Sequence, residues 1–97
     1  SDRAGFYTEM LSALWGYMSD KLSIPVSELS KDNINAELDD YGVDAPLRDA
    51  AMALIDKCEF ARYAPQLAEG DMNQVLDEAV RLIDQLENVK RKKQTAQ

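Results

Sequence analysis

Residues 38–47 read "LDDYGVDAPL", and this stretch holds the signals that end one helix and begin the next. Gly42 suits the position just past a helix C-terminus, because glycine adopts the left-handed backbone there without strain. Asp44 is a good N-cap, and Pro46 fits the first turn of the helix that follows. The stretch therefore predicts two helices joined by a short connection.

The acidic residues of the same stretch raise the question of a calcium loop. "DDYGVD" at 39–44 has carboxylates and a glycine, but it lacks the alternating ligands and terminal Glu of an EF-hand loop. A helix C-terminus followed by an N-cap accounts for these residues. We expect no metal here.

Outward from this connection, apolar residues recur at three- and four-residue spacing and predict four helices. Ser30 is the expected N-cap of the second helix, while Pro25 and Pro65 end the first and third. The helices are expected at about Arg3 to Leu22, Lys31 to Tyr41, Asp44 to Tyr63 and Asp71 to Lys92. No stretch alternates cleanly between apolar and polar side chains, so strands are not expected. The predicted fold is all-α, a compact bundle of about four helices with short connections.

The apolar stripes of these helices predict the core. At about 100° per residue, Leu54, Cys58 and Ala61 share one narrow arc of the third helix, so Cys58 is expected to be a small buried hydrophobe. Trp15 lies at the edge of the first helix's stripe, where an indole is expected to be half-covered. The predicted core consists of Phe6, Met10, Leu14, Tyr17, Leu38, Leu54, Cys58, Ala61, Val75, Ala79, Leu82, Ile83 and Leu86.

The end of the third helix, "CEFARYAP" at 58–65, is apolar on two sides. Phe60 and Tyr63 lie about 150° from the middle of the core arc. Either two helices of this domain cover them, or they face a partner outside this chain. We expect internal packing, because exposure forgoes roughly 1.5–3 kcal/mol for each aromatic side chain. Arg62 is expected to pair with Glu59. The candidate interaction or structural motif comprises Trp15, Glu59, Phe60, Arg62, Tyr63 and Pro65.

Length and charge set further limits. The chain has 97 residues, enough for one small domain, which we place at 1–89 with a basic, frayed tail at 90–97. The net charge is −7, and "KRKK" at 90–93 leaves −11 on the remainder. Such an acidic body repels nucleic acid and anionic lipid.

The catalytic inventory is poor. The chain has no histidine, the commonest general base, and Cys58 therefore has no imidazole to activate it. No glycine-rich phosphate loop, nucleophile elbow or paired-cysteine zinc spacing is present. We expect a non-enzymatic domain without a cofactor.

Two patterns bear on nucleic acid. "ELSKDNINAELDDYGV" at 28–43 resembles the first half of a helix-turn-helix, but the helix after it is neutral rather than basic, which disfavours DNA binding. The tail residues Lys90, Arg91, Lys92 and Lys93 are favoured as solvated charges that suit a helix C-terminus. Weak contact of this tail with lipid or nucleic acid stays an alternative.

Two longer segments carry a family resemblance. "FYTEMLSALWGYMSDKLSIPVSELSKDNI" at 6–34, then "CEFARYAP" and an amphipathic closing helix, resemble the C-terminal region of BatD, of the Bacteroides aerotolerance (oxygen tolerance) group. The resemblance covers roughly residues 6 to 87. It implies the cytoplasmic tail of a single-span membrane protein at the inner membrane. It also implies partners, namely von Willebrand A-domain proteins and a MoxR-type ATPase, and it carries no catalytic residues.

Three functions follow as hypotheses. The favoured one is an interaction domain that docks components of such an assembly, with its membrane anchor outside this chain. A redox sensor based on Cys58 is an alternative, although a sensor thiol should be exposed and electropositive. The third is contact through the basic tail.

Overall fold

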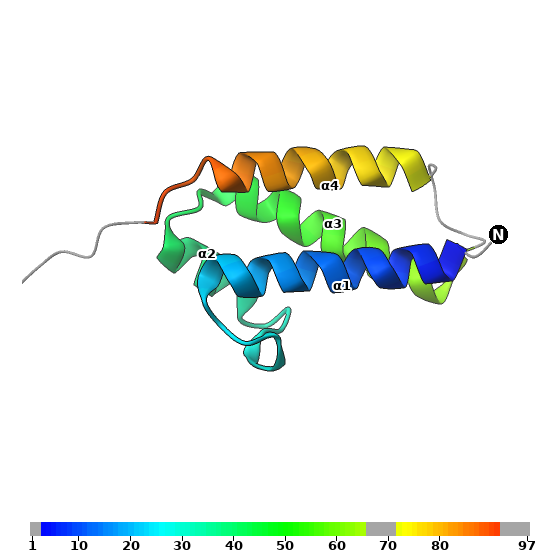
Figure 1. The fold of residues 1–97 in the computed structure, drawn as a ribbon, viewed down its shortest axis with the longest axis horizontal. Coiled ribbons are helices and arrows are strands. Elements are labelled where there is room, and N and C mark those ends of the chain that lie inside the picture. Colours follow the sequence, from blue (N-terminus) through cyan, green and yellow to red (C-terminus); the bar gives the residue numbers. More distant parts are fainter. Residues whose placement is uncertain (1–2, 66–71, 92–97) are drawn as a thin grey trace, which may run out of the picture.

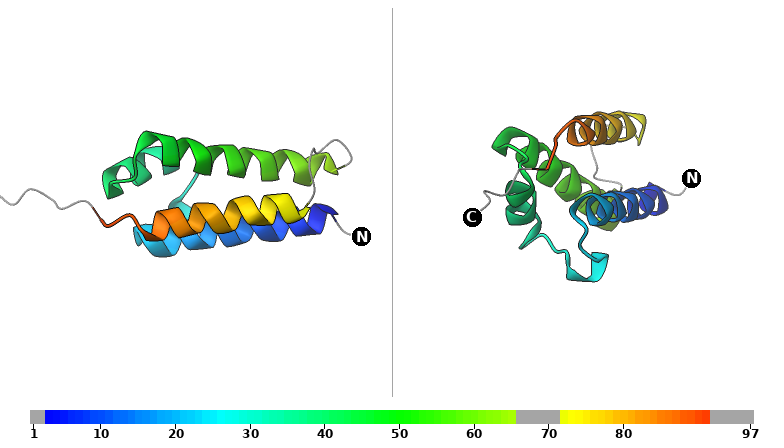
Figure 2. Two further views of the ribbon diagram at one scale, coloured as in Figure 1. Left: turned by 90° about the horizontal axis from the view of Figure 1, so that it is seen from above. Right: turned by 60° about the vertical axis from the view of Figure 1, so that its left-hand side comes forward.

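The computed structural model describes residues 3–65 and 72–91 of the chain. These residues form four α-helices, one short 3₁₀ helix and the segments that connect them (Figure 1). In chain order they are α1 (Arg3–Leu22), η1 (Val26–Glu28), α2 (Ile34–Tyr41), α3 (Ala45–Tyr63) and α4 (Met72–Glu87). The described residues contain no strand, so the predicted all-α bundle is confirmed. Helices α1 and α4 run in the same direction and α3 runs antiparallel to both, while α2 lies near the end of the bundle where α3 begins (Figures 1 and 2).

The connection between α2 and α3 follows the sequence signals. Gly42 has a φ of 120°, and its amide donates to the carbonyl of Asp39 while the Val43 amide donates to that of Leu38. These two bonds form a Schellman motif. Val43 and Leu38 occupy the two positions of its hydrophobic contact, and both are buried. The Asp44 carboxylate then accepts from the Leu47 amide at 3.2 Å as the N-cap of α3.

Two helix ends differ from the sequence prediction. Helix α2 begins at Ile34 rather than Lys31, because Ser30 does not cap it with its side chain; the Ser30 carbonyl instead accepts from the amides of Asn33 and Ile34. Helix α4 ends at Glu87 rather than Lys92. Past that end, the amides of Asn88 and Val89 donate to the carbonyls of Gln85 and Leu86, three residues back, and Val89 packs against the core.

The core lies between α1, α3 and α4, with α2 closing one end. Ten predicted core residues are buried: Met10, Leu14, Leu38, Leu54, Cys58, Ala61, Val75, Ala79, Leu82 and Leu86. Phe6, Tyr17 and Ile83 are only partly buried, which corrects their assignment to the core. On α1 the buried face is turned toward Tyr7, Leu11 and Met18, so Phe6 and Tyr17 fall at its edge.

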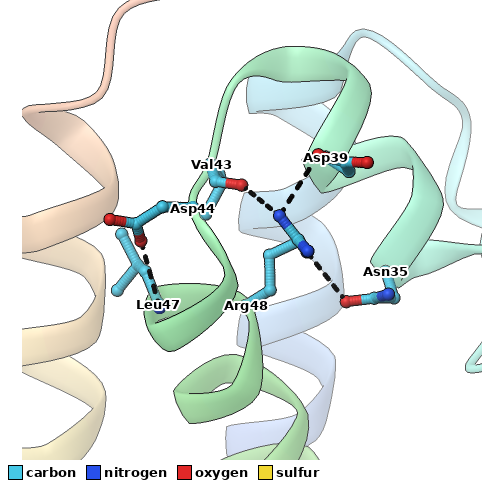
Figure 3. A network of polar contacts seen from close by, with 6 residues as sticks. All are labelled: Asn35, Asp39, Val43, Asp44, Leu47 and Arg48. Atoms are coloured by element: carbon cyan, nitrogen blue, oxygen red, sulfur yellow. Dashed lines mark hydrogen bonds and ion pairs between the residues drawn. The ribbon is translucent and has the colours of Figure 1, made fainter.

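Arg48 fixes α2 against the first half of α3 (Figure 3). Its Nε donates to Asn35 Oδ1 at 3.1 Å, and its Nη1 donates to Asp39 Oδ1 at 3.2 Å and to the Val43 carbonyl at 2.6 Å. The side chain is 17% exposed, so these bonds are partly shielded from water. Arg48 therefore holds α2 at the N-terminal half of α3. Because α2 is only eight residues long, it does not extend to the C-terminal end of α3.

Candidate interaction surface

The C-terminal turns of α3 carry two exposed aromatic side chains. Phe60 is 53% exposed and Tyr63 is 79% exposed, so the prediction that both are buried within the domain is wrong. Cys58 and Ala61, from the same turns, are buried as predicted. We call Phe60 and Tyr63 the aromatic pair.

The exposure of the aromatic pair follows from the lengths of the helices. Helices α1 and α4 cover the face of α3 that contains Cys58 and Ala61. Helix α2 bonds to α3 at Arg48, in the N-terminal half of α3. The C-terminal end of α3 would be buried on both sides only if a further helix covered the face opposite Cys58 and Ala61. None is present in residues 3–65 and 72–91, so the second apolar side of α3 stays open.

The polar neighbours of the aromatic pair are also arranged differently from the prediction. Glu59 pairs with Lys31 at 2.9 Å rather than with Arg62, and Lys31 also binds Asp56 at 2.5 Å. Hydrogen bonds to Asp56 and then Glu59 raise the pKa of Lys31 to about 12. Arg62 instead donates to the Tyr63 hydroxyl at 3.1 Å and lies 4.8 Å from the centre of its ring.

The remaining residues of the candidate motif, Trp15 and Pro65, are not part of this exposed surface. Trp15 is partly buried and packs against the core from α1, as expected for the edge of a stripe. Pro65 follows the end of α3, where Ala64 has left helical geometry and its amide donates to the Phe60 carbonyl at 2.9 Å. The motif thus divides into Trp15, which packs against the core, Glu59, which binds Lys31, and an exposed aromatic pair with Arg62 beside it.

The thiol of Cys58 is poorly suited to redox chemistry. The side chain is fully buried, and desolvation is the main cause that raises the pKa of Cys58 to about 11. A reactive thiol needs an exposed, electropositive site that lowers its pKa. These observations count against the redox-sensor hypothesis.

The acidic side chains form no cation site among the described residues. Asp39 binds Arg48 and Asp44 caps α3, so both act within the helix connection. Nowhere in 3–65 or 72–91 do three or more His, Cys, Asp or Glu side chains gather as metal ligands. Within the same residues, no helix combines the length and apolar character that crossing a membrane requires.

The residues that follow α4 contact side chains of α1 and α2. Lys21, whose side chain is 7% exposed, lies 3.7 Å from Glu87 and 4.8 Å from the centre of the Tyr41 ring, and it donates to the Val89 carbonyl at 3.4 Å. Arg91 approaches the same ring at 5.8 Å. Two of the four basic tail residues, Lys92 and Lys93, lie outside the described residues, as does the rest of the predicted tail to residue 97.

A groove between α3 and α4 was missed by sequence reasoning. It has a volume of about 410 Å³, and a second hollow of about 270 Å³ adjoins it and shares Ala50 and Gln85. The larger hollow is lined by Ala50, Ala53, Leu54, Lys57, Glu78, Arg81, Leu82 and Gln85. The spacing of Pro46, Ala50 and Ala53 along one side of α3 was the available signal, because small side chains leave room beside a neighbouring helix.

The aromatic pair and the groove occupy successive stretches of α3. The pair occupies the last turns of α3, and the groove runs along the preceding turns as far as Lys57. No family model, curated protein or solved structure matches the sequence.

Proposed function

We propose that this domain is a non-enzymatic protein-interaction module that docks partner proteins through Phe60 and Tyr63. The observation that carries the proposal is the exposure of both side chains at the end of an ordered helix. Tyr, Phe and Arg are enriched at the centres of protein interfaces, and Arg62 lies against Tyr63. Leaving the pair exposed forgoes burial energy, which a binding role would recover.

The chemistry of the chain supports binding rather than catalysis. It has no histidine, and its one cysteine is buried with a raised pKa. Arg62 lies against Tyr63, and the charged residues of the same turns are held in place, with Lys31 bound to Asp56 and Glu59. Such a preorganised apolar patch with a polar rim suits docking.

The resemblance to the BatD group supplies the proposed setting. In this proposal the domain is the cytoplasmic tail of an aerotolerance or envelope-stress protein anchored in the inner membrane by a segment outside these 97 residues. The partners would be von Willebrand A-domain proteins and a MoxR-type ATPase. The domain would tether that assembly to the membrane.

Pull-down of the purified A-domain and ATPase partners by the membrane-anchored parent protein tests the proposal. The double variant Phe60→Ala, Tyr63→Ala is expected to lose at least about tenfold in affinity, because interface anchors of this type commonly cost more than 1 kcal/mol on truncation. The matched control is Leu76→Ala, Val80→Ala, which removes two exposed apolar side chains from α4. Full recovery of the partners by the Phe60, Tyr63 variant would overturn the proposal.

A further inference from the structure

The groove between α3 and α4 has an apolar floor, and its walls carry small and charged side chains. Leu54 and Leu82, which are both buried, form an apolar floor. The α3 wall carries Ala50 and Ala53, whose small side chains leave the groove open. Lys57 crosses to Glu78 at 2.9 Å, so these two opposite charges neutralise each other inside the groove.

The outer edges of the groove are acidic on both sides. On α3, Asp49 and Asp56 are exposed and seven residues apart, which places them on one stripe that lies outward from Ala50 and Ala53. On α4, Asp77 and Asp84 are also exposed and seven residues apart, outward from Glu78 and Gln85. Because α3 and α4 are antiparallel and side by side (Figure 2), one row borders the groove on each helix.

We propose that this groove seats a basic amphipathic α-helix of a partner protein, packed lengthwise between α3 and α4. The inference rests on the proposed function as a protein-interaction module, and it adds the chemical class of the partner segment. The partner helix would place small or aliphatic side chains on Ala50, Ala53 and the leucine floor. Lysines or arginines on its flanks would face the two rows of aspartates.

The dimensions fit a short helix. From Pro46 to Lys57 the α3 wall spans 12 residues, which is about 18 Å at 1.5 Å per residue and matches about three turns of a partner helix. Helix-in-groove recognition of this kind uses apolar anchors at three- and four-residue spacing. Phe60 follows Lys57, the last groove residue on α3, by three residues along the helix.

The charges select a basic occupant. Five carboxylates line or flank the groove, namely Asp49, Asp56, Asp77, Glu78 and Asp84, and the cations among its lining residues are Lys57 and Arg81. Lys57 is already engaged by Glu78, and Asp56 is engaged by Lys31. The remaining excess is negative and would attract a cationic helix and repel an acidic one, an anionic membrane or a nucleic acid.

Titration of the 97-residue chain with a synthetic peptide tests this inference. The probe is an 18-residue helical peptide with a leucine and alanine stripe flanked by lysines, and the comparison peptide has glutamates in place of the lysines. Two-dimensional amide NMR locates the site, and fluorescence anisotropy gives the affinity at two salt concentrations. We expect shifts confined to the facing sides of α3 and α4, an affinity that weakens with salt, and no binding of the glutamate peptide.

Matched variants separate groove binding from general attraction to an acidic protein. Ala53→Arg should weaken lysine-peptide binding at least tenfold, whereas Ala13→Arg, the same change at an exposed position of α1, should change it less than twofold. Asp49→Lys with Asp84→Lys should weaken binding more than Asp20→Lys with Asp40→Lys. If Ala53→Arg fails to fold, Ala50→Arg takes its place.

Three outcomes of the peptide and sedimentation measurements would overturn the inference. The first is equal binding of both peptides, and the second is an equal loss of affinity in Ala53→Arg and Ala13→Arg. The third is sedimentation of the chain as a dimer that Ala53→Arg converts to monomer, which would make a second copy the occupant. Pull-downs separate this inference from the proposed function. Partner capture that survives Ala53→Arg but not Phe60→Ala, Tyr63→Ala refutes the groove as a partner site, and capture that survives both refutes the docking role itself.

Discussion

Cys58 and Phe60 are two residues apart on α3 and face opposite sides of it. Cys58 is fully buried, while Phe60 is 53% exposed. A helix with an apolar residue on each side needs a neighbour on each side, and the described part of the chain provides one only for Cys58. Within "CEFARYAP", one side of α3 therefore belongs to the core and the opposite side to the surface.

Truncation of the aromatic pair should leave the domain stable. Phe60→Ala and Tyr63→Ala should each change the free energy of unfolding by less than about 1 kcal/mol, because neither side chain leaves a cavity. Leu54→Ala, at a buried position of the same helix, should cost about 2–5 kcal/mol. Urea melts followed by circular dichroism measure all three. A loss above about 2 kcal/mol in Phe60→Ala would show that the ring is part of the core.

Loss of Arg48 should loosen α2. Arg48→Met should lower the free energy of unfolding by about 1–3 kcal/mol, because Asn35, Asp39 and the Val43 carbonyl lose a shared, partly shielded donor. Arg81→Met, at an exposed position of α4, is the control and should stay within about 0.5 kcal/mol of the parent. Hydrogen exchange of the α2 amides should rise in Arg48→Met alone. Unchanged exchange there would contradict the role of Arg48.

The Cys58 thiol should make stability fall in mildly alkaline solution. The folded-state pKa of about 11 lies above the unfolded value of about 8.5, so the unfolded chain releases its proton first as the pH rises. The contribution of Cys58 is fully present well below pH 8.5 and is lost progressively up to about pH 11, with roughly 1–1.5 kcal/mol lost by pH 9.5. Urea midpoints at pH 8 and pH 9.5 measure the slope.

Cys58→Ala is the control for that slope, because it removes the titrating group from the same buried position. It should show a smaller difference between the two pH values than the parent chain. Labelling of the parent by a thiol reagent at pH 8 should also be limited by unfolding. Rapid labelling of the folded chain would instead favour the redox-sensor hypothesis.

The hydrogen bond between Tyr17 and Glu87 should be visible in the titration of the phenol. Burial is the largest cause that raises the pKa of Tyr17, and the hydrogen bond from its hydroxyl to Glu87 is the next. Glu87→Ala should therefore lower the pKa of Tyr17 without returning it to the value of a free phenol. Absorbance titration at 295 nm, with Tyr17→Phe as the control that identifies the signal, measures it. No change in Glu87→Ala would contradict the contact.

The sequence predicted local features better than the arrangement of helices. The signals at Gly42 and Asp44 act through bonds within a few residues, and they located the connection between α2 and α3 correctly. The burial of Cys58 followed from helical periodicity alone. The exposure of Phe60 could not be predicted this way, because it depends on α2 being short and on where Arg48 holds it.

The long-range polar contacts show the same limit. Arg62 and Glu59 were paired by their spacing, but Lys31 reaches Glu59 from a segment 28 residues earlier. The groove likewise depends on the antiparallel packing of α3 and α4, which the spacing of Ala50 and Ala53 does not specify. Spacing along one helix identifies possible partners, and the tertiary fold selects among them.

Photocrosslinking from the end of α3 tests the docking role most directly. A photoreactive phenylalanine analogue replaces Phe60 or Tyr63 in the proposed membrane-anchored parent protein, and Val80 on α4 is replaced in the same way as the control. With the proposed A-domain and ATPase partners present in purified form, positions 60 and 63 should crosslink to one of them, and position 80 should not. A stable complex that gives no crosslink from position 60 or position 63 would contradict the proposal that this surface docks the partner.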